Sequence, residues 1–236
     1  MIKVEIIRTI IAYITIFLAY LVVITPSGFF RAWVAKKMGD DSAERYGLLS
    51  LNPFDHVDIV GLLMLFWTTS SWRISIPFGG KTFIPLFGWG KFAPLDINKI
   101  RGKYFNSKLI SILFSGVLMY IFVGVAALFL LGFIPKITIQ VSVFRLSSLK
   151  EVIASILAVI FRLSAFLFLV NLASGVVTLI RIHLFDRYPE HTETIFFTTF
   201  ALMFLLLVFF SGQIHYIFNT IVYWIHFKIS SLVGVH

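Results

Sequence analysis

Long apolar stretches separated by short polar segments make up most of this chain. A helix needs about 20 predominantly apolar residues to cross a bilayer. Stretches that meet or approach this length lie at residues 6–30, 59–72, 106–133, 149–182, 195–210 and 214–233. The stretch at 59–72 is short enough to be a partial, re-entrant span, and the last two predict a C-terminal helical hairpin at about 194–233. In the first stretch, Pro26 and Gly28 predict a kink or an early unwinding of the helix.

The segment at residues 73–108 interrupts this pattern. Its β-branched and aromatic residues alternate with Gly and Pro, which favours short strands and turns over a helix. The pattern therefore predicts an all-α polytopic membrane protein of five to six transmembrane helices, with a short β-containing loop near residues 73–97. Residues 1–236 are expected to form a single integral membrane domain.

Positive charge is concentrated in the same segment, where one acid, Asp96, accompanies many Lys and Arg residues. An excess of Lys and Arg in a short loop marks the cytoplasmic side of a membrane protein. With two spans before this loop, Lys3 and Arg8 are expected on the cytoplasmic side as well. A second charged segment joins Asp40, Asp41 and Glu44 to Lys36, Lys37 and Arg45, and we expect it to be solvated at the membrane surface.

Composition supports this assignment. Hydrophobic residues make up 59% of the 236 residues and charged residues 13%, whereas a soluble domain carries about 25% charged residues. The net charge of +9 therefore indicates anionic lipid headgroups at the basic 73–108 loop as the partner, beside the lipid bilayer itself, and not a nucleic acid. The chain contains no Cys, which excludes disulfides and Cys-based metal or nucleophilic sites.

Short motifs follow one another in a fixed order between residues 26 and 61. They are Ala32 and Ala35, Gly39-Asp40, Leu51-Asn52-Pro53, His56, Asp58 and Gly61. This register resembles the signature region of the site-2 protease family of intramembrane zinc proteases, in its small bacterial branch. Further similarities lie at residues 87–94, 115–120, 170–172 and 185–187. The resemblance implies a protease-like core at about residues 6–190 and a bacterial cytoplasmic (inner) membrane location.

The resemblance also identifies the catalytic groups that this chain lacks. The family's HExxH motif places two zinc-binding His residues on one helix face and a Glu that activates water. Ser27 replaces the first His, Gly28 the Glu and Arg31 the second His. The Asp of the family's LDG motif corresponds to Asp186, and its helix-three Asn corresponds to Tyr120. A Ser hydroxyl is a poor zinc ligand, and an Arg guanidinium does not deprotonate in a protein. We therefore expect no zinc, no catalytic residue and no protease activity.

Arg31 and Asp186 are expected to form an ion pair in place of the metal, since their family counterparts converge on one ion. A hydrogen-bonded Arg–carboxylate pair is tolerable in the bilayer, whereas an isolated charge is costly. In the alternative arrangement, Arg31 extends to the membrane surface and Asp186 lies in a hydrated loop.

The expected function is that of a pseudoprotease that binds or scaffolds membrane-protein clients or an envelope complex. One alternative is a divergent metalloprotease with a rebuilt zinc site drawn from His56, Asp58, His183 and Asp186, although His56 and Asp58 are better explained as anchors for the start of the second span. Another is a small transporter or channel component that uses His215, Asn219 and His226, which share a helix face. Packing between helices is the favoured role for those three residues, and for the polar stripe at residues 171–178.

Overall fold

The computed structural model describes residues 2–69, 74–76, 80–82, 88–133 and 149–185, together with the single residues 220, 224, 228 and 231. Its helices are α1 (Ile2–Met38), α2 (Ser42–Arg45), the 3-10 helix η1 (Pro53–His56), α3 (Ile59–Thr69), α4 (Ile97–Ile100), α5 (Phe105–Gly132) and α6 (Leu149–Phe185). Two short strands, β1 (Ile74–Ile76) and β2 (Gly80–Thr82), pair antiparallel.

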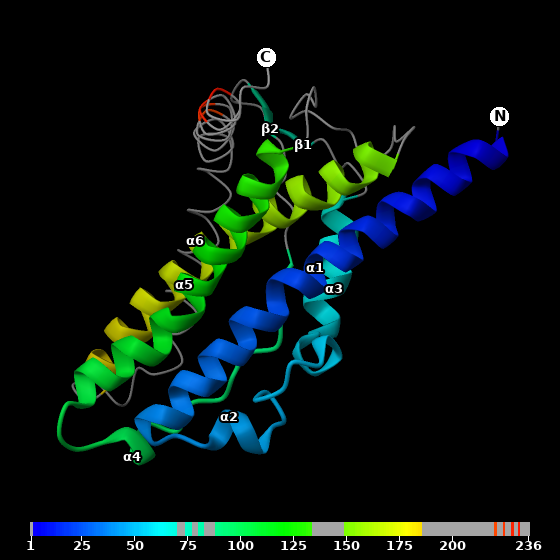
Figure 1. Cartoon of the computed structure of the whole chain (residues 1–236). Helices are drawn as coiled ribbons and strands as arrows, with labels where there is room; N and C mark the ends of the chain where they lie inside the picture. Colours follow the sequence, from blue (N-terminus) through cyan, green and yellow to red (C-terminus); the bar gives the residue numbers. More distant parts are fainter. Residues whose placement is uncertain are drawn as a thin grey trace.

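Three long helices, α1, α5 and α6, form the body of the molecule (Figure 1). Each contains a segment long and apolar enough to cross a membrane: Thr9–Met38, Phe105–Gly132 and Leu149–Ile182. These helices confirm the prediction of a mainly helical membrane protein. The stretches at 195–210 and 214–233 lie almost entirely outside the described residues, so a total of five to six spans stays a prediction.

Small residues allow α5 and α6 to pack closely. A Cβ atom on Gly124 would lie 3.3 Å from Cβ of Ser164, and one on Gly175 would lie 3.1 Å from the ring of Phe114. Small residues at such contacts let helix backbones approach each other in a bilayer, where packing drives helix association. Gly175 belongs to the polar stripe at 171–178, so its environment agrees with the packing role favoured for that stripe.

Helix α1 continues without interruption through Pro26 and ends at Met38. The early unwinding expected near Gly28 is therefore wrong. Pro26 removes one backbone donor, and neighbouring hydroxyl groups bond to carbonyls of the same region. Thr25 Oγ1 donates to the carbonyl oxygen of Leu21 at 2.6 Å, and Ser27 Oγ donates to that of Val23 at 3.1 Å.

Helix α3 has 11 residues, about half the length that a full span requires. Asp58 fixes its first turn by accepting a hydrogen bond from Gly61 N at 2.7 Å. The chain then returns beside its own entry, since Val57 and Gly90 form a β-bridge and Tyr20 of α1 donates to the carbonyl oxygen of Trp89 at 2.8 Å. Val57 and Gly90 therefore lie together beside the middle of α1, and a partial span at 59–72 stays a prediction.

The basic residues near 73–108 do not share one surface. Figure 1 shows β1 and β2 at the end of the molecule opposite to α4. Two three-residue strands are described in the region of the expected loop, and most of the remaining loop up to residue 87 lies outside the described residues.

The expectation that Lys3 and Arg8 share a membrane side with the whole 73–108 segment stays a prediction, since the described parts of that segment lie at both ends of the molecule (Figure 1). A helix of 37 residues is about 55 Å long, so residues 3 and 36 lie at opposite ends of α1. Ala35, near the C-terminal end, packs with Ile100 of α4.

Candidate functional site

The residues at the HExxH positions lie in the interior of the bundle. Ser27 is buried, with 3% of its surface exposed. A Cβ atom on Gly116 of α5 would lie 3.8 Å from the carbonyl oxygen of Ser27, so the α1 and α5 backbones approach closely here. Ser27 and Arg31 are four residues apart and therefore share a helix face.

Tyr120 of α5 connects this face of α1 to α6. Its side chain is buried and lies close to those of Ser27, Asn171 and Arg31. Asn171 Nδ2 also donates to the carbonyl oxygen of Leu167 at 2.9 Å. Arg31 Nε is buried and has no hydrogen-bond partner in the described part of the chain. We call Ser27, Arg31, Tyr120 and Asn171 the interior cluster.

His56 packs against Gly28 beside this cluster. The ring of His56 occupies the space in which a side chain at residue 28 would begin: a Cβ atom placed there would overlap Nδ1 and would lie 3.0 Å from Cε1. The opposite ring nitrogen, Nε2, is 2.7 Å from the carbonyl oxygen of Ser50. A carbonyl can only accept, so Nε2 carries a hydrogen. Nδ1 is buried and has no partner among the described residues.

The sequence-predicted site residues are only partly brought together. His56 and Asp58 hold the entry into α3, the role favoured from the sequence. The proposed partner of Arg31, Asp186, lies outside the described residues, as do His215, Asn219, His226 and the side chain of His183. Within the described ranges, no group of three or more His, Asp or Glu residues is close enough to hold a metal ion.

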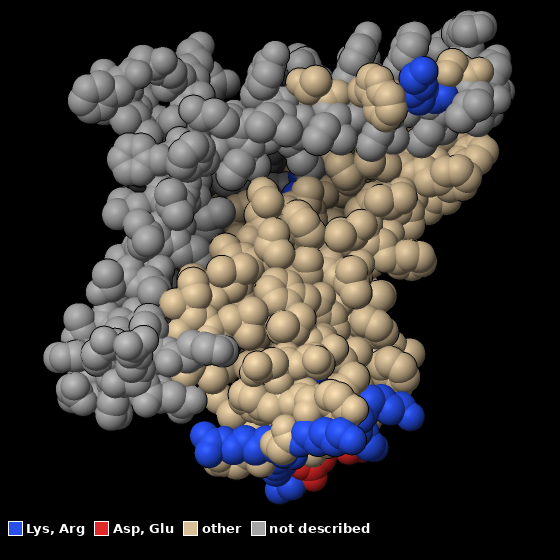
Figure 2. Space-filling model, turned by 90° about the vertical axis from the view of Figure 1, so that its left-hand side faces the viewer, with Lys and Arg blue, Asp and Glu red and all other residues tan. Residues whose placement is uncertain are grey.

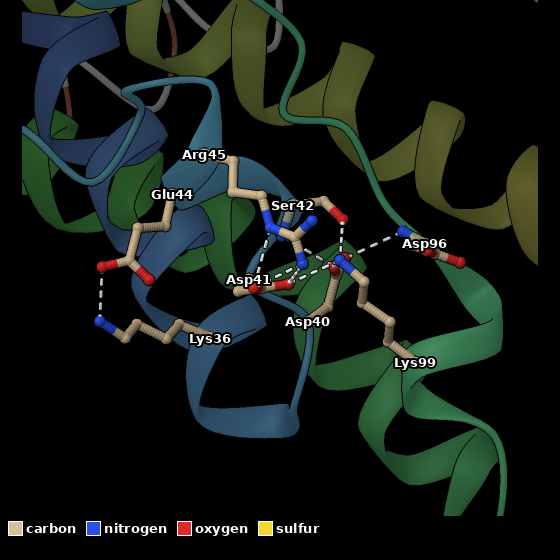
Figure 3. A network of polar contacts seen from close by, with 8 residues as sticks. All are labelled: Lys36, Asp40, Asp41, Ser42, Glu44, Arg45, Asp96 and Lys99. Atoms are coloured by element: carbon tan, nitrogen blue, oxygen red, sulfur yellow. Dashed lines mark hydrogen bonds and ion pairs between the residues drawn. The ribbon is translucent and has the colours of Figure 1, made fainter.

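A second polar cluster closes the other end of α1 (Figure 3). Gly39, with φ of 105°, adopts a left-handed conformation that ends the helix. The turn directs Asp40 inward, where its side chain is fully buried. Asp40 accepts hydrogen bonds from the backbone nitrogens of Ser42 and Asp96, each at 2.9 Å. The Gly39-Asp40 motif therefore fastens α1 to the segment that leads into α4.

Asp41 lies on the exposed side of the same cluster. Lys99 Nζ donates to it at 2.6 Å, and Arg45 donates to both of its carboxylate oxygens. The hydrogen bond from Lys99, followed by that from Arg45, lowers the pKa of Asp41 to about 2. The expectation of a solvated charged segment is confirmed for Asp41 and Glu44 and is wrong for Asp40.

Together, the fold and these clusters define a helical integral membrane protein with polar groups gathered where α1, α5 and α6 meet. A Bacillus subtilis (strain 168) protein described as "Putative zinc metalloprotease YwhC" is 38% identical to this chain over 53 residues. The match covers 22% of this chain and 24% of that protein. No family model and no solved structure matches the chain. The partial match supports a relation to proteases of the site-2 type.

The groups present at residues 27, 28 and 31 do not fit a zinc ion. Zinc is bound by thiolate, imidazole or carboxylate groups, whereas this face of α1 offers a Ser hydroxyl, a Gly and an Arg. The guanidinium of Arg31 would repel a cation. The buried and unpartnered Nε of Arg31 instead suits a negatively charged or hydrogen-bond-accepting group.

Proposed function

We propose that this protein is a catalytically inactive relative of site-2 proteases that binds or scaffolds membrane-protein clients or an envelope complex. The observation that carries the proposal is the packing of the His56 ring against Gly28. In the family, this position holds the Glu that activates water.

A carboxylate cannot be placed at residue 28 without moving His56. The ring of His56 is 1% exposed and is held by the carbonyl oxygen of Ser50. Movement of the His56 ring would break its contact with the carbonyl oxygen of Ser50. It would also disturb the β-bridge between Val57, the next residue, and Gly90. The site is therefore organised around the missing general base, and the substitutions at 27 and 31 remove the metal ligands that such a base would serve.

The loss of protease activity does not remove the surface that would bind a client protein, which consists of β1, β2 and α3. The strands β1 and β2 pair with each other, and each has an outer edge unpaired within the described strands. An extended peptide can add to such an edge through backbone hydrogen bonds. Helix α3 also exposes large apolar side chains, Ile59, Leu63 and Trp67, beside this segment. Both features suit an unwinding transmembrane segment of another protein.

One observation favours the alternative of a rebuilt metal site. Nδ1 of His56 is buried and has no partner among the described residues, and a neutral imidazole nitrogen is a common metal ligand. The remaining ligands would have to come from Asp58, His183 or Asp186.

Metal content of the detergent-purified protein, measured by mass spectrometry after growth with zinc and mild dialysis, separates the two. We expect less than about a tenth of an equivalent of zinc in the wild type and in the Asp186→Ala and His56→Ala variants. About one equivalent in the wild type, lost in either variant, would overturn the inactive assignment.

Client binding is tested with a photo-crosslinking amino acid at Ser75, in β1. Leu118, an exposed residue of the α5 span, is the matched control position. We expect membrane-protein adducts from residue 75 that are absent from residue 118. Equal adducts from both positions would indicate random proximity in the bilayer and contradict client binding.

A further inference from the structure

Charged side chains gather at one end of the molecule. Figure 2 shows Lys and Arg side chains across the lower end, with a few acids among them and a broad uncharged band above. This end contains the last turn of α1, α2, α4 and the start of α5. Ala35, Ile100 and Leu109 pack α1, α4 and α5 together, and Ala43 of α2 packs against Ala32 of α1.

The cations at this end fall into two groups. Lys36, Arg45 and Lys99 are each held by an acid, with Lys36 Nζ 2.6 Å from Glu44, Arg45 2.7 Å from Asp41 and Lys99 2.6 Å from Asp41. A second group has no ion-pair partner within the described ranges: Lys37, Arg101, Lys103 and Lys108. We call this second group the unpaired-cation surface.

Acids near this surface are already engaged. Asp40 is fully buried, and Asp41 is bound by two cations. Glu44 pairs with Lys36, and Asp96 accepts a hydrogen bond from Asn98 N at 3.0 Å. The protein thus neutralises one part of its basic end from within and leaves the other part available to an external anion.

The unpaired cations lie where a bilayer surface is expected. Lys103 and Lys108 flank Phe105, the first residue of a span. Two aromatic residues accompany the cations: Lys103 Nζ lies 5.1 Å from the ring centroid of Tyr104, and Lys37 Nζ lies 5.7 Å from that of Trp33. Tyr104 and Trp33 are exposed, and Tyr and Trp are enriched at membrane–water interfaces.

We infer that the unpaired-cation surface binds the phosphate groups of anionic phospholipids in the cytoplasmic leaflet. Juxtamembrane Lys and Arg residues attract anionic lipids, and their excess identifies the cytoplasmic side. This assignment narrows the basic segment from residues 73–108 to four residues, one of which, Lys37, lies outside that segment. It is independent of the proposed client-binding function.

The test compares two variants that lose equal charge. The full chain, and its Lys103→Gln/Lys108→Gln and Lys36→Gln/Arg45→Gln variants, are reconstituted in phosphatidylcholine vesicles. Electron paramagnetic resonance then measures the association of spin-labelled phosphatidylglycerol relative to spin-labelled phosphatidylcholine. We expect a wild-type preference for phosphatidylglycerol that falls at least about fivefold in the first variant and changes little in the second.

Either of two results would overturn the inference. The wild type could show no preference for phosphatidylglycerol, which would leave the surface to another kind of partner. The two variants could instead lose the preference for phosphatidylglycerol to the same extent, which would show that it depends on the net charge of the protein and not on these four residues. Circular dichroism and thermal melting of each variant establish that the fold is retained before the lipid measurement.

Discussion

The interior of the bundle and the polar cluster at the end of α1 differ in how completely their polar groups are hydrogen-bonded or ion-paired. At the end of α1, every acid from Asp40 to Glu44 has a cation or backbone donor as its partner. In the interior, Arg31 Nε and His56 Nδ1 are buried without a partner in the described part of the chain. Buried polar atoms without partners are rare in folded proteins.

The difference separates residues that hold the fold from residues that mark a site. The polar end uses the acids of a Gly-Asp turn to connect α1 to α4, and its bonds are complete within the chain. The interior cluster gathers side chains of α1, α5 and α6 at the positions that the resemblance assigns to catalysis. Its unpartnered atoms are therefore the natural place for Asp186 or a bound group to act.

The largest expected effect tests whether Asp186 completes the interior cluster. Arg31→Ala and Asp186→Ala should each lower the free energy of unfolding by about 3 kcal/mol or more, since removal of one partner leaves the other charge buried. The double variant should lose clearly less than the sum of the two. Unfolding in detergent, followed by circular dichroism, gives the coupling energy. Strictly additive losses would mean that the two residues do not pair.

Asp40→Ala should destabilise the polar end by about 3 kcal/mol, because the backbone N–H groups of Ser42 and Asp96 lose a charged acceptor. Asp41→Ala, at the next and exposed position, is the matched control and should have a smaller effect. Melting temperatures in one detergent provide the comparison. Equal losses would show that Asp40 acts only through surface charge.

Gly28→Ala should lower the free energy of unfolding by about 2 kcal/mol, because the new methyl group overlaps the His56 ring. Gly116→Ala is the control, since its Cβ atom would make an ordinary contact and alanine favours a helix. His56→Ala should relieve part of the loss in a Gly28→Ala background. A neutral Gly28→Ala variant would contradict the packing on which the inactive assignment rests.

The smallest expected effect is the pH dependence of the stability that the exposed Asp41 contributes. The pKa of Asp41 falls from the ordinary 3.8 to about 2 in the folded protein, so its ion pairs stabilise the fold above pH about 4. This contribution disappears as the pH falls through 2. The melting temperature of Asp41→Asn should therefore differ from that of the wild type at pH 5 and approach it near pH 2. A constant difference across this range would exclude the linkage.

Sequence patterns predicted the main architecture because hydrophobic length is a local property. The spans in α1, α5 and α6 follow from apolar stretches of sufficient length, and the stretch at 59–72 forms a shorter apolar helix. The 73–108 segment was expected on one side, whereas β1 and β2 lie at the end of the molecule opposite to α4 (Figure 1), because contacts such as the one between Tyr20 and Trp89 set the path of the chain. Length alone does not reveal that path.

Contacts between distant residues belong to the tertiary structure. Sequence comparison identified Gly28 as a missing base, but only folding places His56 of η1 against it. In the sequence, Asp40 is one of several charged residues in a polar segment. Its burial depends on Asp96, which lies 56 residues later in the chain and donates a hydrogen bond to it. The sequence by itself determined which stretches are long and apolar enough to cross a membrane. The tertiary structure decided which polar atoms are satisfied, because hydrogen-bond partners are set by the packing of separate segments.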